Sequence, residues 1–333
     1  MPDERRPRLT PPIADVRRAI RETLASLAAE DAGSLVLVAL SGGADSLALA
    51  AATGFEAPRV GLRAGALIVD HGLQPGSDAI AERAAEQARS FGLDPVVVTR
   101  VSVVTDGEGP EAAARSARYG ALDEAATELG ASAVLLGHTL DDQAETVLLG
   151  LARGSGSGSL HGMAALSGRY RRPLLQIRRA QTRAFCVDSG LEAWADPQNS
   201  DPSYARVRVR ERVLPVLERE LGPGIAEALA RTAAQLREDD DALDRMVDEF
   251  IEEICEPAEA GIAVSVAALR ANPPALRQRA IRHVVSSEFG VTLTRAQTIA
   301  VARLVTEWHG QGPLDLPGIR VSRAHGTIVF TAV

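Results

Sequence analysis

The sequence contains no lysine, so its 36 Lys+Arg residues are all arginines. Schiff-base catalysis and the Walker A phosphate loop both require a lysine and are therefore excluded. Only two cysteines are present, Cys186 and Cys255, and they lie far apart with no CxxC spacing. This spacing gives no support to a disulfide framework, a thiolate zinc site or an iron–sulfur cluster, and we expect both thiols to be inert and buried.

Aromatic residues and long apolar runs are also scarce. Aromatic residues make up 3% of the chain, which is too few for a broad base-stacking surface. No stretch approaches the roughly 18 consecutive apolar residues of a membrane span, and the first residues lack the apolar core of a signal peptide. We therefore expect a cytoplasmic protein without a membrane partner. The chain has 333 residues, 46% of them hydrophobic, and this length predicts two or three folded domains.

The net charge of -8 is unevenly distributed along the chain. Residues 238–259 hold eleven acids and one arginine, whereas residues 151–219 hold twelve arginines and six acids. Affinity for a polyanion comes mainly from basic residues that neutralise phosphates. The middle of the chain is thus a candidate for contacts with a nucleic acid, and we expect the acidic segment to face away from it.

In the first half of the chain, apolar runs typical of strands alternate with helical patterns. The expected strands are 34–40, 64–69, 95–103 and 131–136, and the expected helices are 13–29, 45–52, 78–90, 111–129 and 140–152. Repeated strand–helix units predict an α/β fold with a doubly wound, mainly parallel sheet, because parallel strands need a crossover helix. Such sheets bind ligands at the carboxyl ends of their strands.

The alternation stops at a Gly/Ser run, residues 154–159, which we expect to form a flexible loop. Later helical patterns cover 224–255, 275–288 and 294–309, and a hairpin is expected within 313–330. We divide the chain into a lead-in and helix at 1–30, a catalytic domain at 31–221, and a mostly helical appended domain with a short β segment at 222–333.

A glycine-rich turn directly follows the first expected strand, and a helix follows the turn. It reads Ser41-Gly42-Gly43-Ala44-Asp45-Ser46. Such a turn presents backbone N–H groups and the positive end of a helix dipole, which together suit a phosphate. The alternative is a tight turn with a capping Asp or Ser.

Three further segments hold polar residues in chemically useful patterns. Asp70-His71-Gly72 ends the second expected strand, and by itself this tripeptide is typical of an Asx turn. Arg115 and Arg118 share a helix face, where arginines either clamp phosphates or are simply solvated.

In the third segment, Thr139 and Asp142 fit a capping box, and His138, Asp142 and Glu145 fall at helical spacings. A helix dipole alone can account for acids in a first turn. Beside a phosphate loop such acids have a second use, because Mg²⁺ takes carboxylate and phosphate oxygens, and Asp45 and Asp142 are the candidates.

In this order the motifs resemble those of the tRNA(Ile)-lysidine synthetases, members of the PP-loop ATP pyrophosphatases, whose fold is Rossmann-like. The resemblance covers about residues 34–216 and rests on SGGADS at 41–46, VDHGLQPGS at 69–77, EAAARSARY at 111–119, GHTLDDQAET at 137–146, Arg172-Pro173, and DPQNSD at 196–201 with Tyr204 and Arg206. Two positions depart from the family pattern: Gln74 stands where the family has Arg, and Val207 where it usually has Asn.

The resemblance implies an ATP-dependent ligase. ATP adenylylates the C2 oxygen of the wobble cytidine in an isoleucine tRNA with a CAU anticodon, and free L-lysine then displaces AMP to give lysidine. It implies that Ser41, Gly42, Gly43, Ala44, Asp45, Ser46, Asp70 and His71 bind the nucleotide, with Asp45, Arg115, Arg118, His138, Asp142 and Glu145 in catalysis. Asp45 and Asp142 are the expected Mg²⁺ ligands, and 222–333 is expected to bind tRNA. The sequence is compatible with an oligomer as well as with a monomer.

Two alternative functions are also compatible with the sequence. Other PP-loop enzymes modify tRNA or form amides, but thiolation needs reactive cysteines or a cluster, and glutamine-dependent members need an amidotransferase that is not visible in the sequence. A non-catalytic ATP- or RNA-binding protein could also keep the glycine-rich turn. The presence of Asp45, His138, Asp142 and Glu145 together argues against lost catalysis.

Overall fold

The computed structural model describes residues 9–72, 76–101, 110–154, 157–258 and 261–333. The chain divides into two compact units, Met1–Ala234 and Gln235–Val333. The boundary falls inside the 30-residue helix α10 (Ile225–Ile254), whose first turns pack with α5 and α9 through Ala226 and Ala230. No helix in the described part of the chain is long and apolar enough to cross a membrane.

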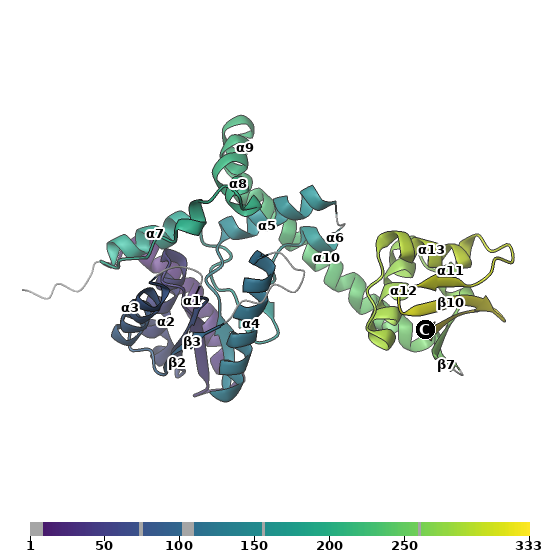
Figure 1. Ribbon diagram of the computed structural model, residues 1–333, viewed down its shortest axis with the longest axis horizontal. Helices are drawn as coiled ribbons and strands as arrows, with labels where there is room; N and C mark the ends of the chain where they lie inside the picture. The colour runs from purple at the N-terminus through teal and green to yellow at the C-terminus, as the bar shows by residue number, and fades with distance from the viewer. Residues whose placement is uncertain (1–8, 73–75, 102–109, 155–156, 259–260) are drawn as a thin grey trace, which may run out of the picture. The chain divides into compact units, whose positions relative to one another are not determined.

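A six-stranded sheet forms the centre of the first unit (Figure 1). Its strand order is β3-β2-β1-β4-β6-β5, and every neighbouring pair is parallel except β5 with β6. The strands are β1 (Leu35–Ala39), β2 (Arg63–Asp70), β3 (Val96–Arg100), β4 (Ala131–Leu135), β5 (Leu166–Ser167) and β6 (Tyr170–Arg171). The predicted doubly wound, mainly parallel sheet is confirmed.

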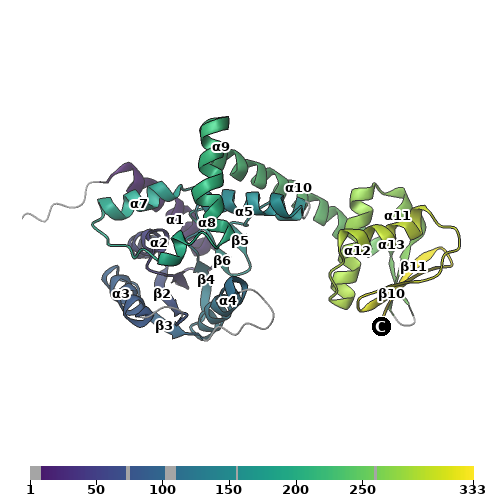
Figure 2. The same ribbon diagram turned by 45° about the horizontal axis from the view of Figure 1, so that its top comes forward.

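Helices cover both faces of this sheet, which explains why its central strands are continuously apolar (Figures 1 and 2). Side chains alternate across a strand, so Val36 and Val38 of β1 pack with α1, α2, α3 and α7, whereas Leu35 and Leu37 pack with α4. The helices are α1 (Pro11–Glu30), α2 (Ala44–Glu56), α3 (Ser77–Ser90), α4 (Pro110–Glu128), α5 (Leu140–Arg153), α6 (Ser157–Leu160), α7 (Arg179–Asp188), α8 (Ala205–Arg208) and α9 (Leu214–Leu221).

Short helical segments complete the unit: η1 (Ala57–Val60), η2 (Pro197–Ser200) and the π-helical η3 (Val209–Val213). One expectation needs correction, because part of the Gly/Ser run is the short helix α6 rather than loop. A Cβ on Gly150 of α5 would lie 2.3 Å from the Ser159 carbonyl oxygen, so the glycine lets α6 approach α5 closely. Residues 155–156 of that run, and 102–103 of the expected third strand, lie outside the described residues.

The strand order reverses between β1 and β4, where the chain winds outward in opposite directions. Ligands of open α/β sheets bind beyond the carboxyl ends of the strands at such a switch point. The segment after β1 is the glycine-rich turn at 41–46, and the segment after β4 holds His138 and the acids of α5. The topology therefore brings these two motifs together.

The second unit packs helices against a five-stranded antiparallel sheet of order β7-β8-β11-β10-β9. Its elements are β7 (Cys255–Ala258), β8 (Gly261–Ser265), α11 (Val266–Ala271), α12 (Pro274–Phe289), α13 (Arg295–Thr306), β9 (Leu314–Leu316), β10 (Ile319–Ala324) and β11 (Thr327–Ala332). The two later helices and the closing hairpin are confirmed. Strands β7 and β8 were not anticipated, because four or five residues beside a long helix give little periodicity.

Candidate functional site

The glycine-rich turn holds its shape through the two serines at its ends. Ser46 Oγ accepts a hydrogen bond from Ser41 N at 3.1 Å and donates to the Gly43 carbonyl at 3.0 Å. Gly43 is the N-terminal cap of α2 and has no side chain with which to bond the N–H groups of the first turn. The turn therefore leaves backbone donors and the positive end of a 13-residue helix available for an anion.

Gly42 fixes this turn against a neighbouring segment. Its φ of 80° lies in the left-handed region, and a Cβ would meet Trp194 Cβ at 3.7 Å. The Trp194 N–H donates to the Gly42 carbonyl at 2.9 Å. A glycine is therefore required by the backbone conformation, and the Trp194 segment holds the turn in place. Both residues border a cavity of about 200 Å³ beside α3.

Asp70 and His71 stand at the carboxyl end of β2. Asp70 Oδ1 accepts from Gly72 N at 2.9 Å, so the expected Asx turn is present, and donors of this kind outweigh burial and lower the Asp70 pKa. His71 Nδ1 is buried without a hydrogen-bond partner among the described residues. Burial, followed by the charge of Arg118, lowers the His71 pKa, so the ring is neutral at pH 7 and able to meet a ligand.

A basic group surrounds the second histidine. His138 Nδ1 is also buried and lacks a partner among the described residues, and burial places the His138 pKa well below its ordinary value. The half-buried Arg118 acts on both histidines, yet no described carboxylate lies within ion-pair distance of it. A guanidinium in this position suits a phosphate. Both guanidinium groups lie over the Tyr119 ring, that of Arg115 at 5.0 Å and that of Arg118 at 5.6 Å from its centre, but Arg115 is exposed.

The predicted capping box opens α5. Thr139 Oγ1 accepts from Asp142 N, and Asp142 Oδ2 accepts from Thr139 N at 2.8 Å and from its hydroxyl at 2.7 Å. The cap thus uses one oxygen of Asp142 and aims the other, Oδ1, away from the helix end. Glu145 lies one turn further along α5 and is fully buried.

Arg179, the first residue of α7, joins three of the predicted acids. Its guanidinium lies 2.7 Å from Asp142 Oδ1, 3.0 Å from Glu145 Oε1 and 3.5 Å from Asp45 Oδ2. Its backbone N–H also donates to Asp141 at 2.7 Å. Sequence reasoning missed this residue, which appeared only as one charge of the basic zone, because its partners belong to two other helices.

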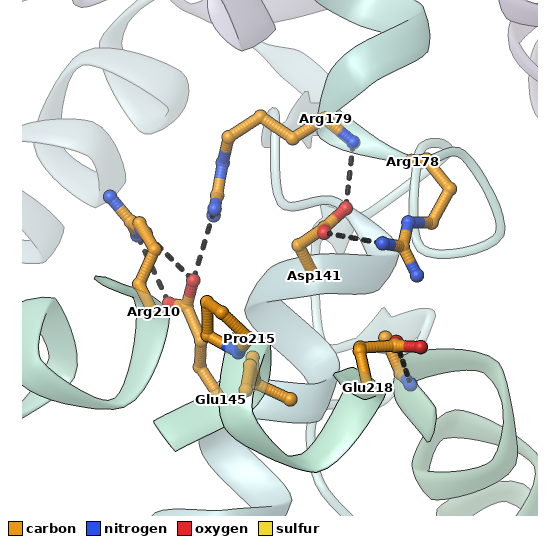
Figure 3. Close-up of a pocket in the computed structure, with 9 residues that line it drawn as sticks. Asp141, Glu145, Arg178, Arg179, Arg210, Pro215 and Glu218 are labelled. Atoms are coloured by element: carbon orange, nitrogen blue, oxygen red, sulfur yellow. Dashed lines mark hydrogen bonds and ion pairs between the residues drawn. The ribbon is translucent and has the colours of Figure 1, made fainter. Parts of the chain in front are cut away.

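Two more arginines from the basic zone, Arg206 and Arg210, pair with Glu145, and Figure 3 shows the pair with Arg210. Arg210 donates from Nε at 2.8 Å and from Nη2 at 3.0 Å, and Arg206 Nε lies 3.7 Å away. Their helix passes through the π-helical η3, a form that is frequent at functional sites. A cavity of about 200 Å³ opens here, lined by Asp141, Glu145, Arg178, Arg179, Arg210, Leu214, Pro215, Glu218 and Ala226.

Charge balance differs between the two proposed metal ligands. Burial raises the Asp45 pKa, helped by the charge of Asp142 and opposed by the Thr182 hydroxyl, which donates to Asp45, and by Arg179. Burial acts in the same direction on Asp142, but Arg179 and the donors of Thr139 outweigh it and lower the pKa. Asp142 is therefore ionised at neutral pH, whereas ionisation of Asp45 is opposed by its surroundings and costs free energy.

The donor set at this position fits Mg²⁺ only in part. Asp45 and Asp142 offer carboxylate oxygens around one shared cation, Arg179. Across the ranges that the structure describes, no cluster of three His, Cys, Asp or Glu side chains could hold a metal ion by itself. A magnesium ion would therefore depend on phosphate oxygens of a nucleotide, as it commonly does.

The remaining sequence expectations have mixed outcomes. Gln74 lies outside the described residues, and so does the Glu111 side chain. Val207, at the other family departure, is buried in α8. Both cysteines are free, and the expectation of burial is confirmed for Cys186 but wrong for Cys255, which is half-buried at the start of β7. Burial raises the pKa of Cys186 to about 11 and also raises that of Cys255, in agreement with inert thiols.

Comparison with known proteins identifies the family. A model described as a PP-loop domain matches residues 16–217, more than half of the chain, and one described as the TilS substrate binding domain matches 265–329. The chain belongs to the tRNA(Ile)-lysidine synthase family. It is 64% identical over 299 residues to the tRNA(Ile)-lysidine synthase of Leifsonia xyli, covering 90% of each chain. The synthase of Thermobifida fusca is 53% identical over 325 residues, covering 97% of this chain and 98% of its own.

A solved structure supports the fold alone. The U34-tRNA thiolase NcsA of Methanococcus maripaludis, solved with its [4Fe-4S] cluster, superposes with a TM-score of 0.58 at 19% identity. The match covers 68% of this chain and 80% of that one. The glycine-rich turn and the α5 acids both lie within residues 16–217, the range that matches the PP-loop domain.

Proposed function

We propose that this protein joins L-lysine to C2 of the wobble cytidine in the isoleucine tRNA with a CAU anticodon, using ATP. The observation that carries the proposal is the meeting, at one switch point, of a phosphate-binding turn and a group of acids, in a chain of this family. The reaction has two steps. The cytidine C2 oxygen attacks the α-phosphorus of ATP as pyrophosphate leaves, and the ε-amine of lysine then attacks C2 as AMP leaves.

The first step requires charge neutralisation around phosphates. The N–H groups of Gly43 and its neighbours face the departing pyrophosphate, and Arg118 neutralises charge at the carboxyl ends of β2 and β4. His138 remains neutral, which suits it to orienting a ligand rather than holding a proton. Mg²⁺, held by Asp45 and Asp142 together with phosphate oxygens, would supply further neutralisation, and Arg179 would then have to yield part of its contact with both.

The second step requires a site for an amine that arrives as a cation and reacts after losing a proton. Glu145 lines the cavity of Figure 3, and Asp142 contacts Arg179 of the same lining, so both acids can provide carboxylates. Arginines in the same cavity match the carboxylate of an amino acid, and Leu214, Pro215 and Ala226 match its methylene chain. A zwitterion with a long side chain therefore fits the lining better than an ammonium ion does.

We assign catalysis to residues 31–221 and assign part of tRNA binding to 222–333, which includes the segment that matches the TilS substrate binding domain. Phosphate contacts would come from exposed arginines of the basic zone. The reaction would take place in the cytoplasm.

The test follows the two steps separately. Purified protein with ATP, Mg²⁺ and the CAU-anticodon transcript should release pyrophosphate, and it should incorporate radiolabelled lysine into that transcript. A transcript with another anticodon serves as the control. Lysine incorporation into neither transcript, with folded protein and ATP present, contradicts the proposal.

Glu145→Ala separates the roles within the site. We expect pyrophosphate release to persist, because lysine does not take part in that step, while the KM for lysine rises about tenfold or more on loss of a charged hydrogen-bond partner. Lysine KM and turnover equal to those of the unchanged protein would remove Glu145 from the amine site. Circular dichroism establishes that the variant is folded.

A further inference from the structure

The acids that the proposed function assigns to lysine already hold cations from the chain itself. Glu145 is fully buried, and both of its oxygens accept from arginines: Oε1 from Arg179 and Arg210, Oε2 from Arg210. Asp142 Oδ1 contacts Arg179 at 2.7 Å and Arg210 at 3.7 Å. An incoming ammonium therefore meets no free carboxylate oxygen on Glu145.

The charges around Glu145 already balance, so binding of a lysine ammonium with all the arginines in place is unfavourable. Asp45, Asp142 and Glu145 carry three negative charges, and the guanidinium groups of Arg179, Arg206 and Arg210 carry three positive ones. The ε-ammonium of lysine would be a fourth cation beside these buried carboxylates, because the lysine carboxylate is a full side-chain length away and cannot pair with it there. An arginine that withdrew by itself would leave a buried carboxylate exposed to the same penalty. The lysine ammonium must therefore replace one of the arginines that contact Glu145.

An arginine that leaves Glu145 needs an anion of its own, and the proposed function brings the phosphates of ATP and RNA to the neighbouring basic group. Arg206 lies against α5, where its Nη2 donates to Thr146 Oγ1 at 3.1 Å and its Nε lies 3.7 Å from Glu145 Oε2. Together with burial, its charge lowers the pKa of Arg118 in the basic group. Arg206 and Arg210 also lie four residues apart on one helical stretch, so a single movement of that stretch shifts both. A phosphate bound there attracts the two arginines away from Glu145.

We propose that Arg210 couples lysine binding to phosphate binding: it occupies Glu145 in the free protein and exchanges that contact for a phosphate, which opens Glu145 to the lysine ammonium. The inference rests on the proposed function, since it uses the same lysine site. Phosphate groups come from the RNA backbone or from ATP, and either can be the partner. Because coupling between two ligands is reciprocal, lysine should tighten phosphate binding by the same factor.

The experiment measures lysine affinity by equilibrium dialysis with radiolabelled lysine. The protein is tested alone, with the tRNA transcript without ATP, and with α,β-methylene-ATP, so that the two sources of phosphate are distinguished. We expect at least one of them to tighten lysine binding about tenfold in the unchanged protein, within the usual range of coupling between sites.

Variants of the same helix test the role of Arg210. Arg210→Gln should bind lysine more tightly than the unchanged protein does in the absence of phosphate, and its coupling factor should fall to about one. Arg210→Lys, which keeps the charge, should restore part of the coupling. Arg219→Gln is the matched control, because Arg219 is exposed nine residues further along and already pairs with Glu220 at 2.7 Å, and it should keep the full factor.

Two results would overturn the inference. One is lysine affinity that neither phosphate ligand changes, in protein that modifies its transcript; the other is equal coupling in Arg210→Gln and the unchanged protein. A protein that binds no lysine under any condition and modifies no transcript counts against the proposed function instead. Thermal unfolding of each variant shows that it is folded.

Discussion

At the scale of single residues, the ionisation of Asp45 in the site lowers the stability of the fold. Its pKa is raised, because burial and the charge of Asp142 oppose ionisation more than Thr182 and Arg179 favour it. A carboxyl with a raised pKa in the folded chain stabilises the fold below its unfolded pKa, and that contribution is lost as pH rises through the folded pKa. At neutral pH the ionised Asp45 therefore disfavours folding.

Asp45→Asn should accordingly raise the melting temperature at pH 7.5 while abolishing pyrophosphate release. The gain should shrink as pH falls through the folded pKa of Asp45, because the unchanged protein then also carries a neutral group. Differential scanning calorimetry across this pH range checks the effect. Asp78→Asn is the control: Asp78 holds the same position in α3 but is exposed, and losing its charge at the helix end should slightly lower stability. A melting temperature lowered in both variants would contradict this assignment.

Single residues also mark where sequence reasoning ends. The predicted acids Asp45, Asp142 and Glu145 do meet, since each follows a strand end that the topology brings to one edge. Their arginine partner could not be predicted, because Arg179 lies 34 residues from Glu145 and 37 from Asp142. No spacing rule links such positions, and twelve arginines in the zone offered equal candidates.

At the scale of elements, the capping box connects the stability of α5 to the position of Asp142. It could be predicted from sequence because it depends on two residues three apart. Removing the threonine hydroxyl should cost about 1 kcal/mol of stability. It should also release Asp142 Oδ2 from one of its two donors, so that Oδ1 is less well placed for a ligand.

Thr139→Ala should therefore lower thermal stability and also raise the KM for lysine. Thr294→Ala offers a matched comparison, because Thr294 and Gln297 form the same kind of box at the start of α13, outside the proposed catalytic domain. We expect that variant to lose a similar amount of stability, about 1 kcal/mol, with no change in the lysine KM. Steady-state kinetics with varied lysine concentration measure the KM. An unchanged lysine KM in Thr139→Ala would show that the capping box does not position Asp142 for lysine.

Some elements of the fold can be predicted from local sequence patterns, and others cannot. The parallel strands β1, β2, β3 and β4 and their helices could be located because apolar runs alternate there with helical patterns. β5, β6, β7 and β8 could not, because short strands gain their stability from partners that are distant in sequence.

At the scale of the whole molecule, net charge is a poor guide to RNA binding. The chain carries -8 overall, and the basic zone at 151–219 is itself partly neutralised. Arg179, Arg206 and Arg210 pair with acids that lie outside the zone, and Arg208 donates to the carbonyls of Pro202 and Ser203. The number of arginines available for phosphates is therefore smaller than the sequence indicates.

The salt dependence of tRNA affinity measures how many phosphate contacts remain. If the exposed Arg153, Arg183 and Arg212 each neutralise one phosphate, affinity should fall about 20- to 40-fold between roughly 50 and 200 mM salt. Filter binding over that range gives the slope, which Arg212→Gln should reduce by about one contact. Arg219→Gln should leave it nearly unchanged, because Arg219 already pairs with Glu220 at 2.7 Å. A flat salt profile would mean that this zone does not bind the RNA backbone, and the phosphate that draws Arg210 from Glu145 would then have to come from ATP.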